Sequence, residues 1–356
     1  MNINILKIKE NMKKLKEQLE FERVRYHGYQ NWYEMLEFFR KEMMNYVELD
    51  ELGNINPKMT QLDNGHIIDH HAMGYLAPLD FKRTGFYYDK RSPSEQLILL
   101  NDQLRENGVR FIYVALPCKK AIYPEFIVPN IDPKMNVIPQ WRKMLLELVD
   151  HGVEVVDIFP EFQKRKNNIS LYVTKNHHIS PLGADVVAQK IADYLSDTTT
   201  DLVCEDWAFT QIKMGIQLGM GALFNRPVVN RDDFYIANTV QIKENNNDNI
   251  YIYTAMNEAV LSSKIIMIGD CNLQAFLQHG ASIVSNASYY LNYPIHYGGR
   301  YLLFDFEIDG IWKMPEHTLK SKEILIYVGF PSASFVRARN ETDRWSTQFI
   351  SSNCFK

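Results

Sequence analysis

Two segments that lie far apart in the chain carry the residue types of a covalent acyl-transfer site. In residues 266–272 an apolar run leads directly into Gly269, Asp270 and Cys271. A nucleophile on a sharp turn between a strand and a helix is exposed at the end of the sheet, and the N-terminus of the following helix lowers the pKa of a thiol placed there. We therefore predict that Cys271 is the nucleophile.

The second segment, residues 176–181, supplies a candidate base and the group that orients it. Residues two apart in an extended segment point to the same side, so the Asn176 amide oxygen can accept a hydrogen bond from one ring N–H of His178. The other ring nitrogen of His178 would then face Cys271, which gives the Cys-His-Asn form of a catalytic triad. Each residue alone has a plainer interpretation, because a lone cysteine is most often a small buried hydrophobe and a lone histidine at a helix start is more often a cap.

Helices and strands alternate in the part of the chain that must position these residues. Residues 92–95 read Ser-Pro-Ser-Glu, a capping box with proline at the first helical position. The predicted helices are residues 92–108, residues 139–152 and a third that begins at Ser180-Pro181, and the predicted strands are residues 109–116, 153–159, 265–268 and 324–328. The strand runs are short and almost wholly apolar, as in parallel strands buried on both faces. The pattern predicts a doubly wound α/β fold, which binds its ligands at the carboxyl ends of the strands.

Two regions break this alternation. The N-terminal region begins with an apolar stripe at steps of three and four over only two heptads, formed by Ile5, Ile8, Met12, Leu15 and Leu19. This stripe predicts a surface helix that packs on its own domain or on a dimer partner, so a homo-oligomer through this helix is one expectation. We predict a helical N-terminal extension and loop over residues 1–74 and the α/β domain over residues 75–356. An insertion interrupts that domain at about residues 201–263, in which residues 234–243 and 250–254 are a candidate hairpin.

Four sequence blocks resemble, in order and spacing, the alginate O-acetyltransferase-type SGNH-hydrolase-like proteins of bacterial exopolysaccharide acetylation. The blocks are residues 108–125, 152–158, 176–184 and 269–271. In that family the third block reads Asp-Thr-His-Trp-Ser-Pro-x-Gly-Ala, and the fourth carries the nucleophilic serine after glycine. The resemblance implies a flavodoxin-like three-layer sandwich with a mostly parallel sheet, and an acyl-enzyme mechanism.

The sequence departs from the family pattern at two catalytic positions, where Asn176 replaces aspartate and Cys271 replaces serine. A thiol of low pKa is already partly thiolate beside a protonated histidine, so a neutral orienting amide suffices. The paired change therefore predicts a retained, cysteine-based activity. The alternative is a relative that has lost catalysis and keeps the fold as a saccharide- or carrier-protein-binding module.

An oxyanion hole completes the predicted site. We assign it to the backbone amide of Cys271 together with Gly298 and Gly299, because glycine lets a backbone N–H approach the substrate closely. A simple turn at these glycines is the alternative. Lys119 and Tyr123 follow a predicted strand end, where they either line the pocket or occupy a solvated surface position.

Metal binding is not expected. His66 and His70 have the HxxxH spacing that on a helix suits zinc, but neither a helix signal nor a third ligand accompanies them. We expect no cofactor either.

Composition excludes several classes of protein. The net charge of −4 over 356 residues argues against a dedicated nucleic-acid binder, and the absence of an apolar run of eighteen residues argues against a transmembrane helix. The first seven residues hold no continuous apolar segment of the secretory type, and the four cysteines form no CxxC pair. We therefore expect a cytoplasmic protein with reduced thiols.

The resulting functional hypothesis is an acyltransferase that forms an acyl-cysteine intermediate. Its donor would be a thioester, either acyl-CoA or an acyl carrier protein, and its acceptor a hydroxyl or amine of a small molecule, with a sugar suggested by the resemblance. A thioesterase or esterase of the same fold differs only in that water takes the acyl group. The third alternative is the inactive binding module.

Overall fold

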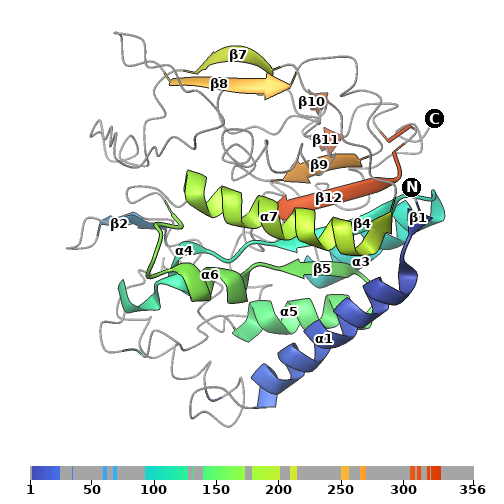
Figure 1. Ribbon diagram of the computed structural model, residues 1–356, viewed down its shortest axis with the longest axis horizontal. Coiled ribbons are helices and arrows are strands. Elements are labelled where there is room, and N and C mark those ends of the chain that lie inside the picture. Colours follow the sequence, from blue (N-terminus) through green and yellow to red (C-terminus); the bar gives the residue numbers. More distant parts are fainter. Residues whose placement is uncertain are drawn as a thin grey trace.

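The computed structural model describes the chain in separate stretches (Figure 1). They are residues 2–24, 34, 59–61, 67–69, 93–126, 131, 139–172, 179–200, 209–214, 250–255, 265–269, 305–308, 311–313, 319–320 and 322–329.

A parallel sheet lies at the centre of the described structure. Its strands in spatial order are β5 (Glu154–Asp157), β4 (Arg110–Ala115), β12 (Ile324–Gly329) and β9 (Ile265–Gly269). All three neighbouring pairs are parallel, as the apolar runs predicted. Every residue of β12 is buried, as expected of a strand covered on both faces.

Helices cover both faces of the sheet, which confirms the predicted three-layer α/β architecture. α3 (Pro93–Glu106) and α5 (Pro139–Asp150) contact each other on one face, and α7 (Pro181–Thr198) lies on the other (Figure 1). Right-handed crossovers explain this division. The connection through α5 runs from β4 outward to β5, whereas the chain that contains α7 runs back across the sheet to β9.

Two similar turns lead from helices into strands. Gly108 after α3 and Gly152 after α5 have φ angles of 74° and 76°, a left-handed conformation that glycine adopts without a steric penalty. Beyond the first glycine, the Val109 amide donates to the Leu104 carbonyl at 2.9 Å, and Val153 makes the equivalent bond. This closure satisfies the last carbonyls of each helix and directs the chain into β4 or β5.

Strand β5 is shorter than the predicted run of residues 153–159, because the chain turns at Asp157. The Phe159 amide donates to Asp157 Oδ1 at 3.2 Å, and α6 (Phe159–Arg165) begins there. Ile158 and Phe159 are apolar and buried, so they extend the apolar pattern of the strand although they no longer belong to it. A side chain that bonds its own backbone two residues on is a turn signal that hydrophobic periodicity does not contain.

The N-terminal helix α1 (Ile5–Val24) packs on its own domain, along the β5 edge of the sheet. It contacts α5, α7 and β5, and the Val155 amide of β5 donates to Met12 Sδ at 3.4 Å. Of the predicted apolar stripe, Leu15 and Leu19 are buried and Ile5 is 60% exposed. A helix in this place shields an edge strand from pairing with another chain. The predicted domain boundary at residue 74 stays a prediction. The helix of the predicted N-terminal extension, α1, shares the hydrophobic core of the α/β domain through Leu15 and Leu19.

The other described strands lie outside the central sheet. The remaining strands form antiparallel pairs: β1 (Asn2–Ile3) with β6 (Thr199–Thr200), β2 (Met59–Gln61) with β3 (Ile67–Asp69), β7 (Phe209–Met214) with β8 (Ile250–Ala255), and β10 (Asp305–Ile308) with β11 (Ile311–Lys313). Within the predicted insertion, β8 thus pairs with β7, and residues 234–243 lie outside the described residues. Alternating side chains identify a strand but not its partner. Among the helices in the described ranges, none is both long and apolar enough to cross a bilayer.

Candidate functional site

The predicted catalytic and oxyanion-hole residues lie outside the described residues. These are Asn176, His178, Cys271, Gly298 and Gly299, and their roles stay predictions. The structure does describe the strand that precedes Cys271. It also describes the residues on both sides of the segment that contains Asn176 and His178. Those elements show where the two segments leave the fold.

The strand that precedes Cys271 ends at the carboxyl edge of the sheet, close to the end of β4. Gly269, the last residue of β9, pairs with Val328, and Val328 pairs with Val114 on its other side. Neighbouring strands are about 4.8 Å apart, so Gly269 lies roughly 10 Å from Val114. Cys271 follows two residues later in the sequence, outside the described residues.

The segment that contains Asn176 and His178 leaves and re-enters the described structure at one point. Tyr172 and Ile179 form an antiparallel bridge, and the Ser180 amide donates to the Leu171 carbonyl at 2.9 Å. Ile179 is 1% exposed. His178 is therefore bonded directly to a residue that is fixed in the core.

Tyr172 ties this point to the carboxyl end of β4. Its hydroxyl donates to the Pro117 carbonyl at 2.6 Å, and the side chain is buried. The ring packs edge-on against Phe162 and Tyr123, with centroid distances of 5.8 and 6.1 Å. The Tyr172 hydroxyl thus reaches the carboxyl end of β4, and β4 lies two strand positions from β9 in the sheet.

The first turn of α7 explains the Ser-Pro-x-Gly sequence that follows His178. Ser180 caps the helix, because its Oγ accepts a hydrogen bond from the Gly183 amide at 3.0 Å and donates to the Ser170 carbonyl. Pro181 occupies a position where its missing N–H costs nothing. A Cβ at Gly183 would overlap the Leu171 carbonyl oxygen. Glycine therefore lets α7 approach the strand-like residues that precede the predicted histidine.

Lys119 and Tyr123 do not occupy the solvated surface positions that were the plainer alternative for them. Lys119 is 3% exposed, so a surface position is wrong for it. The Tyr123 hydroxyl donates to the Lys166 carbonyl at 3.3 Å and accepts from the Leu171 amide at 3.5 Å. Burial raises the pKa of Tyr123, which keeps this hydroxyl protonated. Sequence position at a strand end indicated the correct neighbourhood but not these backbone contacts.

A buried ion pair holds the same region together. Lys166 Nζ donates to the Ile122 carbonyl at 2.8 Å and lies 3.1 Å from Glu125 Oε1. It thus joins the end of α6 to the short helices α4 (Lys119–Ile122) and η3 (Pro124–Phe126). The path from β4 to the predicted histidine is fixed at several points.

A second thiol, that of Cys118, lies at this edge between Pro117 and Lys119. Burial raises its pKa. The thiolate is the nucleophilic form of cysteine, so Cys118 is a weak nucleophile at neutral pH. It serves as an internal reference for the reactivity predicted of Cys271.

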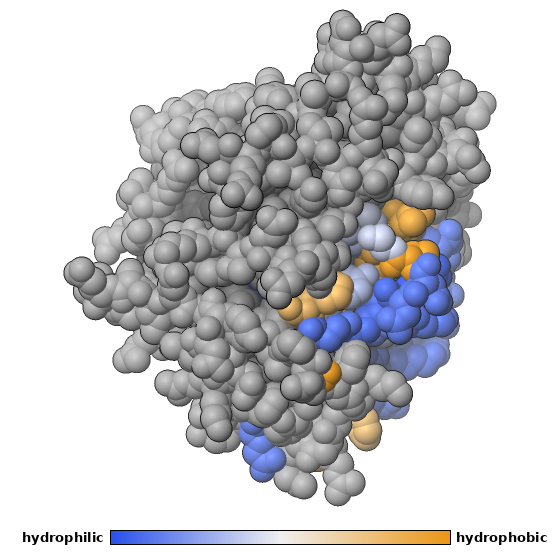
Figure 2. Space-filling model, turned by 90° about the vertical axis from the view of Figure 1, so that its left-hand side faces the viewer, coloured by the Kyte–Doolittle hydropathy of each residue, from blue (hydrophilic) through white to orange (hydrophobic). Residues whose placement is uncertain are grey.

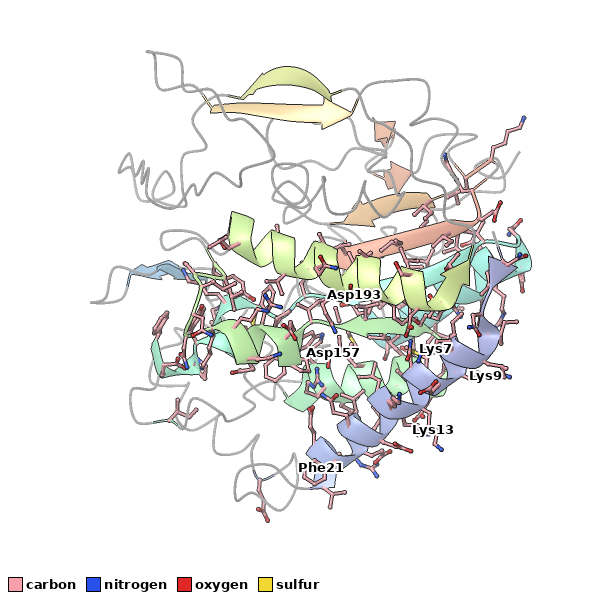
Figure 3. All side chains as sticks on the ribbon, viewed as in Figure 1. Lys7, Lys9, Lys13, Phe21, Asp157 and Asp193 are labelled. Carbon is pink, nitrogen blue, oxygen red and sulfur yellow. The ribbon has the colours of Figure 1, made fainter. Side chains whose placement is uncertain are left out.

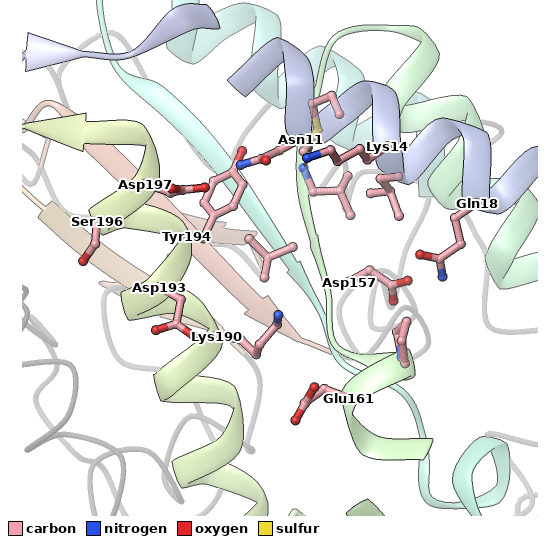
Figure 4. A pocket seen from close by; sticks show the side chains of 15 residues that line it. Asn11, Lys14, Gln18, Asp157, Glu161, Lys190, Asp193, Tyr194, Ser196 and Asp197 are labelled. Atoms are coloured by element: carbon pink, nitrogen blue, oxygen red, sulfur yellow. Dashed lines mark hydrogen bonds between the residues drawn. The ribbon is translucent and has the colours of Figure 1, made fainter. Parts of the chain in front are cut away.

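Figure 2 shows the side of the molecule that lies on the left in Figure 1, and the described residues visible on it are apolar and hydrophilic side by side. A separate groove of about 660 Å³ opens at the β5 edge, between α1 and α7 (Figure 4). Asn11 and Lys14 line it from α1, and Lys190 and Asp193 from α7. In the described sheet β5 and β9 are opposite edge strands, so this groove opens at the edge away from β9.

The histidines of the HxxxH motif flank a strand and not a helix. Residues 67–69 form β3, while His66 and His70 lie outside the described residues. A search of the described ranges finds no group of three potential metal ligands.

Comparisons with known proteins agree with this architecture. Residues 88–245 match the family described as SGNH hydrolase-like domain, acetyltransferase AlgX. The match includes the positions of Asn176 and His178 and ends before Cys271. The chain thus contains a region similar to an SGNH hydrolase-like domain.

Similarity to individual proteins is more distant. The probable alginate O-acetylase AlgJ of Pseudomonas aeruginosa is 26% identical over 96 residues, which are 27% of this chain and 24% of that protein. The chain therefore spans about a quarter of the length of this curated relative. Solved structures with a similar trace include the O-acetyltransferase domain of Pseudomonas putida AlgJ, with 12% identity, a TM-score of 0.48, and 81% of this chain and 95% of that chain covered. Another is Pseudomonas aeruginosa AlgX, with 16% identity, a TM-score of 0.46, and 78% and 64% covered.

Proposed function

We propose that this chain is an acyltransferase that works through a covalent acyl-cysteine intermediate. Cys271 is the nucleophile, His178 the proton carrier and Asn176 the group that orients His178. The observation that carries the proposal is the common sheet edge: Tyr172, which bridges to Ile179, bonds through its hydroxyl to Pro117 just after β4, and β4 lies two strand positions from β9. In α/β folds this edge is where ligands bind.

In the first half-reaction the Cys271 thiolate attacks the carbonyl carbon of an acyl thioester. The new S–C bond forms as the C–S bond to the donor thiol breaks, and protonated His178 gives its proton to the departing sulfur. Backbone amides of Cys271, Gly298 and Gly299 stabilise the negative charge on the carbonyl oxygen. The products are an acyl-enzyme and a free thiol.

In the second half-reaction neutral His178 takes the proton of the acceptor hydroxyl or amine. The acceptor oxygen or nitrogen bonds to the acyl carbon, the S–C bond to Cys271 breaks, and the thiolate–imidazolium pair is restored. Water in place of the acceptor would make the same site a thioesterase. The difference lies only in which nucleophile reaches the acyl-enzyme.

The names of the relatives support a hydroxyl acceptor, because an alginate O-acetylase transfers acetyl groups to sugar hydroxyls. Thiolates exchange readily with thioesters, which favours acyl-CoA or an acyl carrier protein as donor. A cytoplasmic location belongs to the same proposal, since these donors are found there. Cell fractionation with an antibody against the chain tests it, and recovery outside the cytoplasm would contradict this part.

Intact-protein mass spectrometry after incubation with a panel of acyl-CoA thioesters tests the central step. We expect one acyl group per chain, mapped by peptide analysis to Cys271. Cys271→Ala should abolish the adduct, while Cys118→Ala should retain it, because the Cys118 thiol has a raised pKa. Iodoacetamide at neutral pH should modify Cys271 faster than Cys118.

An unmodified Cys271 across the panel, together with a thiol that ignores iodoacetamide, would contradict the acyltransferase. It would instead favour the binding module. Release of free acid from the acyl-enzyme in the presence of sugars, with no acylated sugar, would identify a thioesterase.

A further inference from the structure

We propose that Tyr172 is a positioning residue for His178. This inference rests on the proposed function. The hydroxyl of Tyr172 holds the segment that carries the histidine against the carboxyl end of β4, and so sets the position from which the imidazole reaches Cys271.

The contacts of Tyr172 are unusual for a core tyrosine, because both its backbone and its side chain fix the same segment. The backbone bridges to Ile179, the residue bonded to His178, and the hydroxyl donates to the Pro117 carbonyl at 2.6 Å. With 1% of the residue exposed, water does not compete for this bond. Tyr172 thus connects the residues next to the histidine segment to the end of β4, which lies two strand positions from β9.

The ring and the hydroxyl have separable roles. The ring fills space between Phe162 and Tyr123, whereas only the oxygen reaches Pro117. Burial also raises the pKa of Tyr172 well above its ordinary value, so the hydroxyl stays protonated and a donor at neutral pH. Phenylalanine at this position would keep the packing and remove the tether.

Tyr123 provides a weaker version of the same function. Its hydroxyl accepts from the Leu171 amide at 3.5 Å, one residue before Tyr172. This bond is long, and so it contributes less to fixing the segment. We therefore expect Tyr123 to help fix the segment in the same way as Tyr172, but less strongly.

The test compares Tyr172→Phe, Tyr123→Phe and Tyr194→Phe. Tyr194 is the matched control, because its hydroxyl also donates to a partly buried acceptor, Glu154 Oε2 at 2.9 Å, but at the amino end of the sheet. We expect Tyr172→Phe to slow acylation of Cys271 about ten- to a hundredfold, since a misplacement of about 1 Å costs on the order of a hundredfold. KM should stay near the wild-type value, Tyr123→Phe should lose a fewfold, and Tyr194→Phe should keep the wild-type rate.

A second readout does not depend on turnover. NMR of isotope-labelled histidine should show shifted ring resonances and an altered pKa of His178 in Tyr172→Phe and not in Tyr194→Phe. If wild-type protein is acylated and Tyr172→Phe matches it in rate, pH profile and His178 resonances, the positioning role is wrong and the proposed function stands. If wild-type protein is not acylated, the proposed function fails, and unchanged His178 resonances would overturn the positioning role separately. If Tyr172→Phe does not fold, Tyr123→Phe is used for the same test. A Tyr123→Phe variant whose acylation rate and His178 resonances equal those of the wild-type protein would then overturn the inference.

Discussion

The two ends of the parallel sheet are held in different ways. At the amino end, side chains bond to other side chains: Arg110 makes a bidentate pair with Glu154, at 2.7 and 2.8 Å, and donates to the hydroxyls of Thr198 and Thr199. Tyr194 adds its hydroxyl to the same carboxylate. This cluster joins β4, β5 and the end of α7 into a closed unit.

At the carboxyl end of β4, side chains bond mainly to the backbone of connecting segments. Tyr172 bonds to the Pro117 carbonyl, Lys166 to the Ile122 carbonyl and Ser180 to the Ser170 carbonyl. A bond from a side chain to a backbone carbonyl fixes the path of a loop. The charge cluster instead joins two strands and a helix that also pack against one another. We infer that the amino end serves stability and the carboxyl end positions the chemistry.

A third cluster, which joins α1 at the β5 edge to α5 and β5, should give the largest effect. Arg142 of α5 is 0% exposed and pairs with Glu22 of α1 and Asp157 of β5, each at 2.7 Å, and their carboxylates raise its pKa despite its burial (Figure 3 shows Asp157). Arg142→Met leaves two buried carboxylates without a counter-charge and should cost about 3–5 kcal/mol of unfolding free energy in urea denaturation. Lys143→Met is the control, because the Lys143 side chain is 67% exposed and lies 3.8 Å from Glu147 in a surface ion pair. Equal loss in the two variants would show that the buried network adds nothing.

The amino-end cluster should give the next largest effect. Arg110→Met should lower the unfolding free energy by about 3 kcal/mol, less than Arg142→Met, because Glu154 keeps the Tyr194 hydroxyl as a partner. The rate of Cys271 acylation per folded molecule should not change. A large drop in that rate would break the division of roles between the two ends.

Glycines at the two ends sharpen the comparison. Gly183→Ala should cost about 1–3 kcal/mol through overlap with the Leu171 carbonyl, and should also slow acylation of Cys271. Gly108→Ala meets open space but a φ of 74°, so it should cost about 1 kcal/mol through backbone strain alone. Urea denaturation and acylation rates measure both. An acylation defect in Gly108→Ala, or none in Gly183→Ala, would contradict the comparison.

The smallest expected effect is an alkaline loss of stability shared by both ends. Burial raises the pKa of Tyr172 and of Tyr194 above the ordinary value near 10, so the folded state keeps protons that the unfolded state releases. The stabilisation is complete below about pH 10 and falls above it, by about 1.4 kcal/mol per pH unit for each tyrosine. Urea denaturation between pH 9 and 11 measures the slope, which Tyr172→Phe and Tyr194→Phe should each reduce. An unchanged slope in both variants would show that these hydroxyls titrate normally.

Much of the scaffold was predictable because its signals are local. Glycine at 108 and 152 ends two helices, Ser180-Pro181 begins a third, and apolar runs mark the four strands. The places where prediction failed are equally instructive. Asp157 turns the chain by bonding the Phe159 amide, inside what reads as one apolar run. Lys119 is buried although its residue type favours the surface.

The candidate site was predictable only as two separate segments. The sequence by itself determined the residue types around positions 178 and 271 and the elements that carry them, because periodicity and caps depend on neighbours within a few residues. Only the tertiary structure decided that β9 lies one strand from β12 and two from β4, that α1 closes the β5 edge, and that Tyr172 reaches Pro117. Contacts between distant segments depend on the packing free energy of the whole domain. No single stretch of sequence determines that free energy, so these contacts cannot be inferred from local patterns.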